Sequence, residues 1–220
     1  MYPGEAVHTE EYKGYEIAIY PDDNPFRPDE SGEESLYLVG FHRDFSVGKM
    51  REEFAQTLYN GGKDEEGTKD EEAVAFLKRY HVFPIEAYIH GGVALSLQNE
   101  GNFPDRRWDV SLVGLVFVEK KIKRTRKAAR KSALSLIEEW NDYLSGNVYG
   151  YVVRKNGERV DDASCWGFYG DYKKWCLTEA RSAVDAEVAY VEKQKQKRVK
   201  SLIQNRVPLE VRASVVTSFA

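Results

Sequence analysis

Alternation of apolar and polar positions marks the first predicted strand. Residues 12–20 read YKGYEIAIY, in which apolar side chains fall on every second position, at Tyr15, Ile17 and Ile19. A period of two is typical of a half-buried strand. Residues 36–42 (LYLVGFH) form a short apolar run, which predicts a second strand paired with the first. The polar residues 1–12 predict a loose end.

Five further strands follow from apolar runs and turn signals. Residues 85–97 (IEAYIHGGVALSL) predict a hairpin, because Gly91-Gly92 can supply the positive φ angles of a tight turn. Residues 110–118 (VSLVGLVFV) are the most apolar run and predict a central strand. Residues 148–153 and 164–169 predict two more strands, separated by a turn signal at Asn156-Gly157.

Apolar residues at spacings of three and four predict the helices. A short helix is expected near residues 47–59, with Ser46 as its N-cap, and another at 71–80, capped by Asp70. Residues 125–144 carry a clear helical pattern and are followed by Gly146, a common helix stop. A long helix is predicted over 172–204, polar after Glu192, and a final short helix or tail over 209–219.

Short turns between most neighbouring strands predict antiparallel pairing, and the helices come as insertions rather than after every strand. The predicted class is therefore α+β: a largely antiparallel sheet of about seven strands packed by two or three helices, with a long C-terminal helix extending from the domain. We expect one domain over residues 1–190, followed by a polar helical extension and tail over 191–220.

Composition narrows the class of protein. The 220 residues are 42% hydrophobic, enough to build a core, which excludes a disordered chain. No apolar stretch approaches the roughly 20 residues that a membrane helix needs. The first residues lack the pattern of a signal peptide, and two cysteines exclude a disulfide scaffold, so we expect a cytoplasmic location.

Charge is nearly balanced overall, at −4, but it is unevenly distributed. Acidic runs occupy residues 22–34 and 64–72, whereas residues 120–131 hold eight basic side chains in twelve positions. On a helix this run forms a broad basic face that could neutralise phosphates of a nucleic acid. The alternatives are a solvated helix start and pairing with the acidic loops. The candidate binding residues are Lys120, Lys123, Arg124, Lys127, Arg130 and Lys131.

The loop FPDRRWD (residues 103–109) is a second candidate surface, since Trp and Arg dominate recognition hot spots. The alternative is that Trp108 plugs the end of the sheet while Asp109 bonds to loop backbone. Side chains outside this loop, at His90 and in residues 165–169, could meet the loop in one pocket. The full candidate set is His90, Arg106, Arg107, Trp108, Asp109, Cys165, Trp166 and Tyr169.

Motifs that specify chemistry are lacking. The glycine pairs have neither the lysine of a P-loop nor the spacing of a dinucleotide fingerprint, and no histidine pair has helical metal-binding spacing. Cys165 and Cys176 are expected to be core residues, because a catalytic cysteine needs a partner such as His90. We therefore predict no catalytic residues, no cofactor and no metal site.

Four short elements of the chain resemble those of an uncharacterised family of phage and mobile-element proteins. In that family a Tyr-x-His-Ser-Gly element is followed by a Trp-Asp-Ser-Gly-Gln-Val-Gly element, a Leu-x-Gly-x-Val-Tyr-Gly element and a Cys-Trp-Gly-Phe-Tyr-Gly element. The matching positions are Tyr88, His90, Gly92, Trp108, Asp109, Gly114, Gly146, Val148, Tyr149, Gly150 and residues 165–170. The family's serine is Gly91 here, and its Ser-Gly-Gln is Val110-Ser111-Leu112. The resemblance covers residues 12–190 and implies a genomic setting rather than a mechanism.

Two functions compete at this point. The first is a non-enzymatic accessory protein of a virus or mobile element that binds a host macromolecule, such as a CRISPR or restriction complex, with acidic loops imitating phosphates. The second is a nucleic-acid-binding or nucleic-acid-processing protein that uses the basic run at 120–131. A homodimer through the 172–204 helix is a further expectation.

Overall fold

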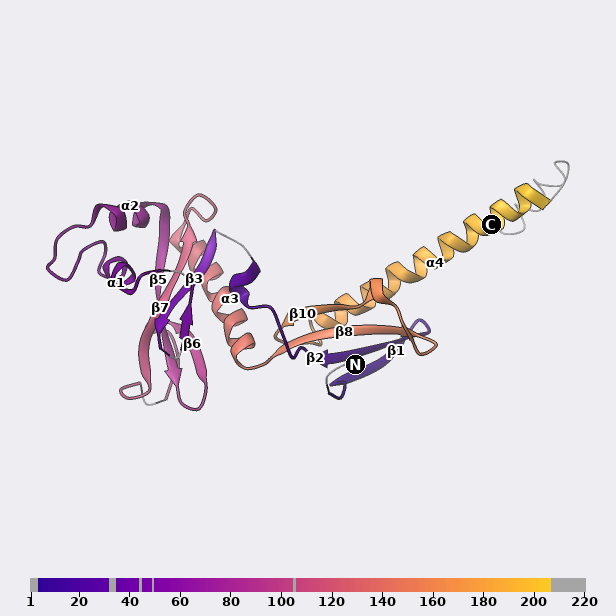
Figure 1. Ribbon diagram of the computed structural model, residues 1–220, viewed down its shortest axis with the longest axis horizontal. Helices are drawn as coiled ribbons and strands as arrows, with labels where there is room; N and C mark the ends of the chain where they lie inside the picture. Colours follow the sequence, from indigo (N-terminus) through magenta and orange to yellow (C-terminus); the bar gives the residue numbers. More distant parts are fainter. Residues whose placement is uncertain (1–3, 32–34, 44, 49, 105, 207–220) are drawn as a thin grey trace. The chain divides into compact units, whose positions relative to one another are not determined.

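The protein was analysed as a computed structural model, which describes residues 4–31, 35–43, 45–48, 50–104 and 106–206. The final helix predicted at 209–219 lies outside these residues. The chain divides into two compact units (Figure 1): a central unit of residues 22–148, and a terminal unit of residues 1–21 and 149–220. We expected one domain over residues 1–190 with one sheet. Each unit instead has its own sheet and its own core.

The central unit is built on a five-stranded antiparallel sheet in the order β4-β3-β7-β5-β6. Its strands are β3 (Leu36–His42), β4 (Phe45–Val47), β5 (Tyr80–Ile89), β6 (Val93–Leu97) and β7 (Val110–Glu119). The prediction that residues 110–118 form the central strand is confirmed. Gly114 lets β3 approach β7, because a Cβ atom there would lie 2.2 Å from the Val39 carbonyl oxygen.

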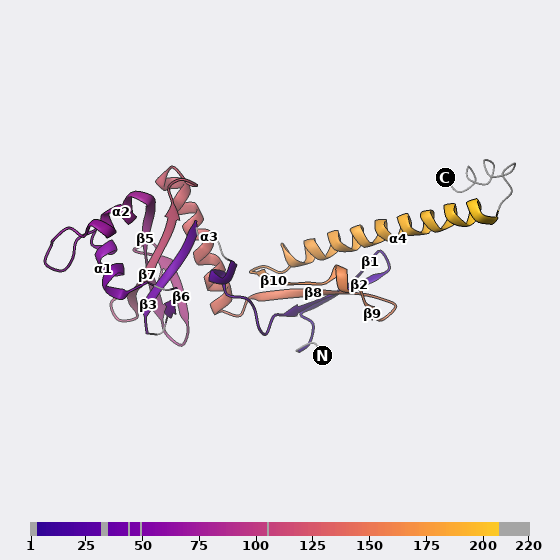
Figure 2. The same cartoon turned by 45° about the horizontal axis from the view of Figure 1, so that its top comes forward.

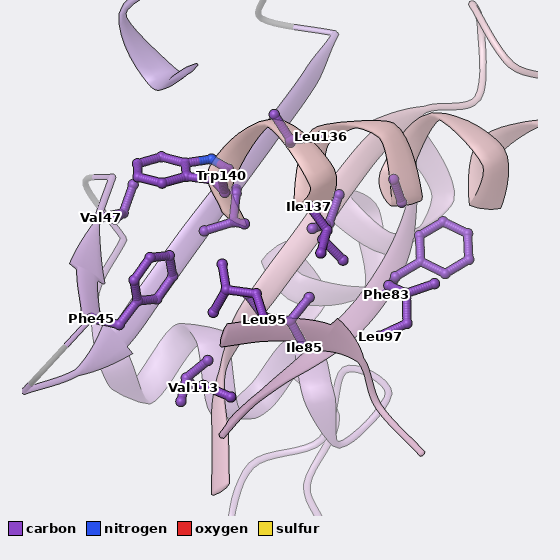
Figure 3. Packing of buried hydrophobic residues seen from close by; sticks show 14 of the residues in the cluster. Phe45, Val47, Phe83, Ile85, Leu95, Leu97, Val113, Leu136, Ile137 and Trp140 are labelled. Atoms are coloured by element: carbon purple, nitrogen blue, oxygen red, sulfur yellow. The ribbon is translucent and has the colours of Figure 1, made fainter. Parts of the chain in front are cut away.

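Helices cover both faces of this sheet (Figure 2). On one face, α3 (Arg126–Leu144) packs Trp140 and Ile137 against Phe45, Ile85 and neighbouring strand residues, as Figure 3 shows. On the other, α1 (Glu52–Tyr59) and α2 (Glu71–Arg79) cover an aromatic cluster around Phe117. Burying an apolar face on each side of the sheet is what holds the unit together.

The terminal unit has a second antiparallel sheet, in the order β1-β2-β8-β10, with β9 paired to β8. Its elements are β1 (His8–Tyr12), β2 (Tyr15–Pro21), β8 (Val148–Lys155), β9 (Glu158–Arg159), β10 (Cys165–Tyr169) and α4 (Cys176–Arg206). The first half of α4 buries Cys176, Ala180 and Val184 against the sheet. Its second half continues beyond the strands of its own unit.

Most predicted elements are confirmed, and so is the α+β class. The cap at Asp70 accepts a hydrogen bond from the Ala73 amide, and Gly146 ends α3 with φ of +72°. Thr125 caps α3 by accepting a hydrogen bond from the Ala128 amide. The hairpin, the central strand and the long C-terminal helix also lie where the pattern places them.

Three expectations were wrong. Residues 8–12 are not a loose end but an edge strand, in which exposed side chains alternate with half-buried ones. Residues 45–47 form a strand instead of a helix start, with Phe45 and Val47 facing the core. The strand at 36–42 pairs with β4 and β7 rather than with the first predicted strand. A short apolar run specifies a buried strand but not its neighbour, which explains the last error.

Candidate functional site

A run of exposed cations lies where β7 passes into α3. Seven basic side chains of residues 120–131 are solvent-exposed. Five of them form no side-chain hydrogen bond or ion pair among the described residues, and we call them the basic surface: Lys121, Lys123, Arg124, Lys127 and Lys131. Across the described parts of the chain, none of the five forms an ion pair with a carboxylate. The described residues of the acidic loops therefore form no ion pair with the basic surface.

Two members of the predicted binding set have structural partners instead. The Lys120 ammonium donates a 2.6 Å hydrogen bond to the Leu77 carbonyl oxygen, which ties the end of β7 to α2. The Arg130 guanidinium pairs with both carboxylate oxygens of Glu100, and this bond raises the pKa of Arg130. Lys120 and Arg130 thus support the fold around the basic surface.

Charge at the start of α3 opposes the helix dipole. The first turn of α3 contains Arg126 and Lys127 and no acidic residue. In α2, by contrast, the first turn contains Glu71 and Glu72 and the last turn contains basic side chains, the arrangement that a helix dipole favours. The unfavourable placement on α3 indicates that these cations serve something other than helix stability.

The basic surface also includes a shallow hollow. Its walls come from α3 and consist of Thr125, Lys127, Ala128, Arg130, Lys131 and Leu134. Of the amides in the first helical turn, that of Ala128 donates to the Thr125 side chain, and the others lack partners within the helix. Lysine ammonium groups and free amides are the donors that phosphate oxygens accept from in proteins.

A second group of exposed cations lies on α4 in the terminal unit. Beyond Glu192 the helix presents five exposed basic side chains without an ion pair among the described residues, at Lys193, Lys195, Lys197, Arg198 and Lys200. Each unit thus carries its own basic surface.

The loop before β7 is held down by a buried ion pair. Both terminal oxygens of Glu86 accept hydrogen bonds from the Arg106 guanidinium, at 2.7 and 2.8 Å, and the Glu86 carboxylate also accepts from the Asn99 amide. Arg106 donates a further bond to the Gly101 carbonyl oxygen. Arg106 therefore anchors the loop and is not a free recognition residue.

Trp108 does not plug the end of the sheet, contrary to that alternative. Its side chain is 82% exposed, with the Arg107 guanidinium 5.8 Å from the ring centre. Nearby, the Nδ1 atom of His90 lies 3.7 Å from a carboxylate oxygen of Asp109, and the Asp109 carbonyl oxygen accepts from the Ile89 amide. The central unit thus brings together His90 and Asp109 beside an exposed tryptophan.

The remaining candidates belong to the terminal unit. Cys165 is exposed on β10, whereas Trp166 packs on Gly150, where a Cβ atom would lie 2.2 Å from the indole ring. Tyr169 is half-buried at the end of the same strand. Cys176 is buried in α4, and burial raises the pKa of its thiol to about 12. The core role expected for cysteine is confirmed for Cys176 and wrong for Cys165.

Residues 60–70, between α1 and α2, form a loop that we call the acidic hairpin, and hydrogen bonds within the loop hold it. The Asp64 carboxylate accepts a 2.7 Å hydrogen bond from the Thr68 amide, and the Asp70 amide donates to the Gly62 carbonyl oxygen. Glu65 and Glu66 are exposed at its tip. In the other acidic run, Arg27 pairs with Asp29.

Sequence reasoning missed Glu86 and a pocket at the edge of β5. Glu86 is a charged residue within a predicted strand, and a charge at such a position indicates a pairing with an opposite charge. The pocket depends on tertiary packing and has no signal in the sequence. Within the described residues, no group of three or more His, Cys, Asp or Glu side chains is placed to hold a metal ion. In the same part of the chain, no helix combines the length and apolar character needed to cross a membrane.

No protein family model, no curated protein and no solved structure matches this chain. The resemblance to phage and mobile-element proteins therefore stays a prediction.

Proposed function

We propose that this protein binds nucleic acid through the basic surface at the start of α3. The observation that carries the proposal is the exposed charge of the basic surface, which forms no ion pair among the described residues. Two of its members, Lys127 and Lys131, line a shallow hollow on α3. A surface of this kind recruits polyanions by releasing their condensed counterions, and it needs no catalytic group.

The phosphate backbone is the polyanion that this geometry fits best. The exposed donors are mostly lysine ammonium groups, which bind phosphate as point charges. The terminal unit has exposed cations of its own on α4, which suit the same class of ligand. Cations at the start of a helix slightly destabilise it, and an anionic ligand bound there would neutralise them.

A charge-matched pair of variants tests the proposal. We expect the triple substitution Lys121→Ser, Lys123→Ser and Lys127→Ser to weaken binding of a fluorescent oligonucleotide about tenfold or more at about 50 mM salt. The control is the triple substitution Lys63→Ser, Lys69→Ser and Lys78→Ser, which removes the same charge from exposed positions on and near the acidic hairpin. Equal binding by the two variants would contradict the proposal.

A second candidate rests on the acidic hairpin. Because internal hydrogen bonds hold the hairpin, the exposed Glu65 and Glu66 carboxylates form a rigid pair of anions. Such a pair suits the basic surface of a host protein, as expected of a non-enzymatic accessory protein of a virus or mobile element that blocks a CRISPR or restriction complex. In this reading the protein acts in the host cytoplasm.

A lysate experiment separates the second candidate from the first. We expect any host protein retained by the wild type to be lost with Glu65→Gln and Glu66→Gln, and kept with Glu187→Gln and Glu192→Gln on α4. Retention that both variants preserve would count against a role for the acidic hairpin.

A further inference from the structure

A pocket of about 310 Å³ lies beside the basic surface, at the edge of the central sheet. The backbone of β5 forms its floor, α1 and α2 contribute one wall, and the passage from β7 into α3 contributes the other. Its lining includes Leu58, Tyr59, His81, Pro84, Lys120 and Arg126. This volume is at the lower end of the range for small-ligand pockets.

The pocket exists because β6 covers only half of β5. Residues 85–89 of β5 pair with β6, whereas residues 80–84 have no strand on that side within the described chain. Two carbonyl oxygens of this open half already have donors and cannot pair with an added strand. The Val82 oxygen accepts from the Arg126 guanidinium at 3.4 Å, and the Pro84 oxygen accepts from the Gln98 backbone amide. Edge strands are commonly protected in this way, so an added peptide strand is disfavoured.

Hydrogen bonds hold both walls in place. The Tyr59 hydroxyl accepts a 3.0 Å hydrogen bond from the Gln98 side-chain amide, which fixes the ring at the end of α1 while 37% of the side chain stays exposed. On the other wall, the Nε2 atom of His81 lies 3.1 Å from the Lys123 carbonyl oxygen. The pocket is thereby fixed directly against the basic surface.

We propose that this pocket receives one unpaired base of a single-stranded nucleic acid, with the base against Tyr59 and Pro84 and its flanking phosphates on Lys123 and Lys127. An exposed aromatic ring beside a basic groove is the combination with which proteins hold single strands, since every base has a face that can stack. A duplex keeps its bases paired and cannot fill the pocket without unpairing one.

The inference rests on the proposed nucleic-acid binding and adds a preference for single strands. Charge alone favours the duplex, whose phosphates are more densely spaced along the axis. A preference for the single strand therefore reports contacts with bases.

Fluorescence anisotropy with a single-stranded DNA of about 20 nucleotides and the matching duplex tests the inference on the full chain. We expect the wild type to bind the single strand more tightly. Tyr59→Ala should weaken single-strand binding about tenfold or more and leave duplex binding unchanged. Tyr59→Phe keeps the ring but loses its bond to Gln98, and it should retain most of the single-strand binding that Tyr59→Ala loses.

Three results would overturn the inference. One is a wild type that binds the duplex equally or better; another is Tyr59→Ala weakening both ligands alike or neither. The third is a poly-glutamate peptide that competes for the wild type as effectively as the single strand does, since the surface would then accept any polyanion. If neither DNA binds at about 50 mM salt, the proposed nucleic-acid binding itself is wrong.

Discussion

At the scale of single residues, the pair formed by Glu86 and Arg106 is the most consequential polar contact of the central unit. The Glu86 side chain is 6% exposed and that of Arg106 is 38% exposed, so the carboxylate depends on its partner for hydrogen bonds. Loss of the guanidinium would leave a buried charge without compensation, which costs far more than an exposed ion pair contributes.

We predict that Arg106→Ala lowers the free energy of unfolding of the protein by about 2 kcal/mol, allowing for the partial exposure of the arginine. The neighbouring Arg107→Ala is the matched control and should change it by less than about 0.5 kcal/mol, because that residue is exposed and its guanidinium lies over the exposed Trp108 ring. Denaturant unfolding followed by intrinsic fluorescence gives both values. A similar loss in the two variants would show that the buried pair does not anchor the loop.

At the scale of elements, α3 places charge against its own stability. We predict that Lys127→Glu raises the free energy of unfolding by about 0.5 kcal/mol, because an anion suits the first turn of a helix, and at the same time weakens nucleic-acid binding. Thermal unfolding and anisotropy measure the two effects.

The control for that substitution is Lys78→Glu in the last turn of α2. It makes the same change of charge at a position where a cation is favourable, so it should lower the free energy of unfolding and leave nucleic-acid binding unchanged. If the Lys127→Glu variant binds nucleic acid as tightly as the wild type does, Lys127 does not take part in binding, and the proposed role of the basic surface is contradicted.

The contact between β1 and α4 is acid-sensitive. Glu10 accepts two 2.7 Å hydrogen bonds from Arg181, and this partner lowers the pKa of the Glu10 carboxyl. A lowered folded-state pKa means that the stabilisation is present above the unfolded-state pKa and is lost as the pH falls through the folded-state value. We predict that the stability difference between the wild type and Arg181→Met shrinks as the pH falls from about 6 to about 3. Thermal unfolding across this range measures it; a difference independent of pH would contradict the expected linkage.

At the scale of the whole molecule, the C-terminal half of α4 combines exposed apolar side chains with like charges. Tyr190 and Leu202 are exposed, and five basic residues accompany the single Glu192 in residues 192–200. The homodimer expected through this helix stays a prediction, and repulsion between two such helices should make it weak at low salt.

Salt screens that repulsion, so any dimer through α4 should strengthen between about 50 mM and about 500 mM salt. Sedimentation velocity at two protein concentrations measures this. A dimer that is tighter at low salt would place the contact elsewhere on the chain.

Helix caps and periodicity were sufficient to predict much of the fold. Asp70 and Gly146 were predicted as helix ends and are so in the structure, and the apolar run of β7 marks its central position. The predicted cap at Ser46 was wrong, because that residue lies in β4, and the cap at Thr125 was not predicted. The division into two sheets was not predictable, because strand pairing depends on contacts between distant segments.

The candidate site was predictable only in part. The basic run was visible as a cluster of lysines and arginines, but its freedom from the acidic loops is a tertiary property. Sequence alone could not separate Lys120 and Arg130, which support the fold, from Lys123 and Lys127, which face solvent. The pocket beside Tyr59 depends on how far β6 extends along β5.

The most direct test of nucleic-acid binding by the basic surface is the salt dependence of oligonucleotide affinity. Each phosphate contacted on a single strand contributes a slope of about −0.7 in a plot of log affinity against log salt, so five contacts predict a slope of about −3.5. The triple substitution Lys121→Ser, Lys123→Ser and Lys127→Ser should make that slope shallower by about 2. No binding at about 50 mM salt, or the same slope in both proteins, would contradict this function.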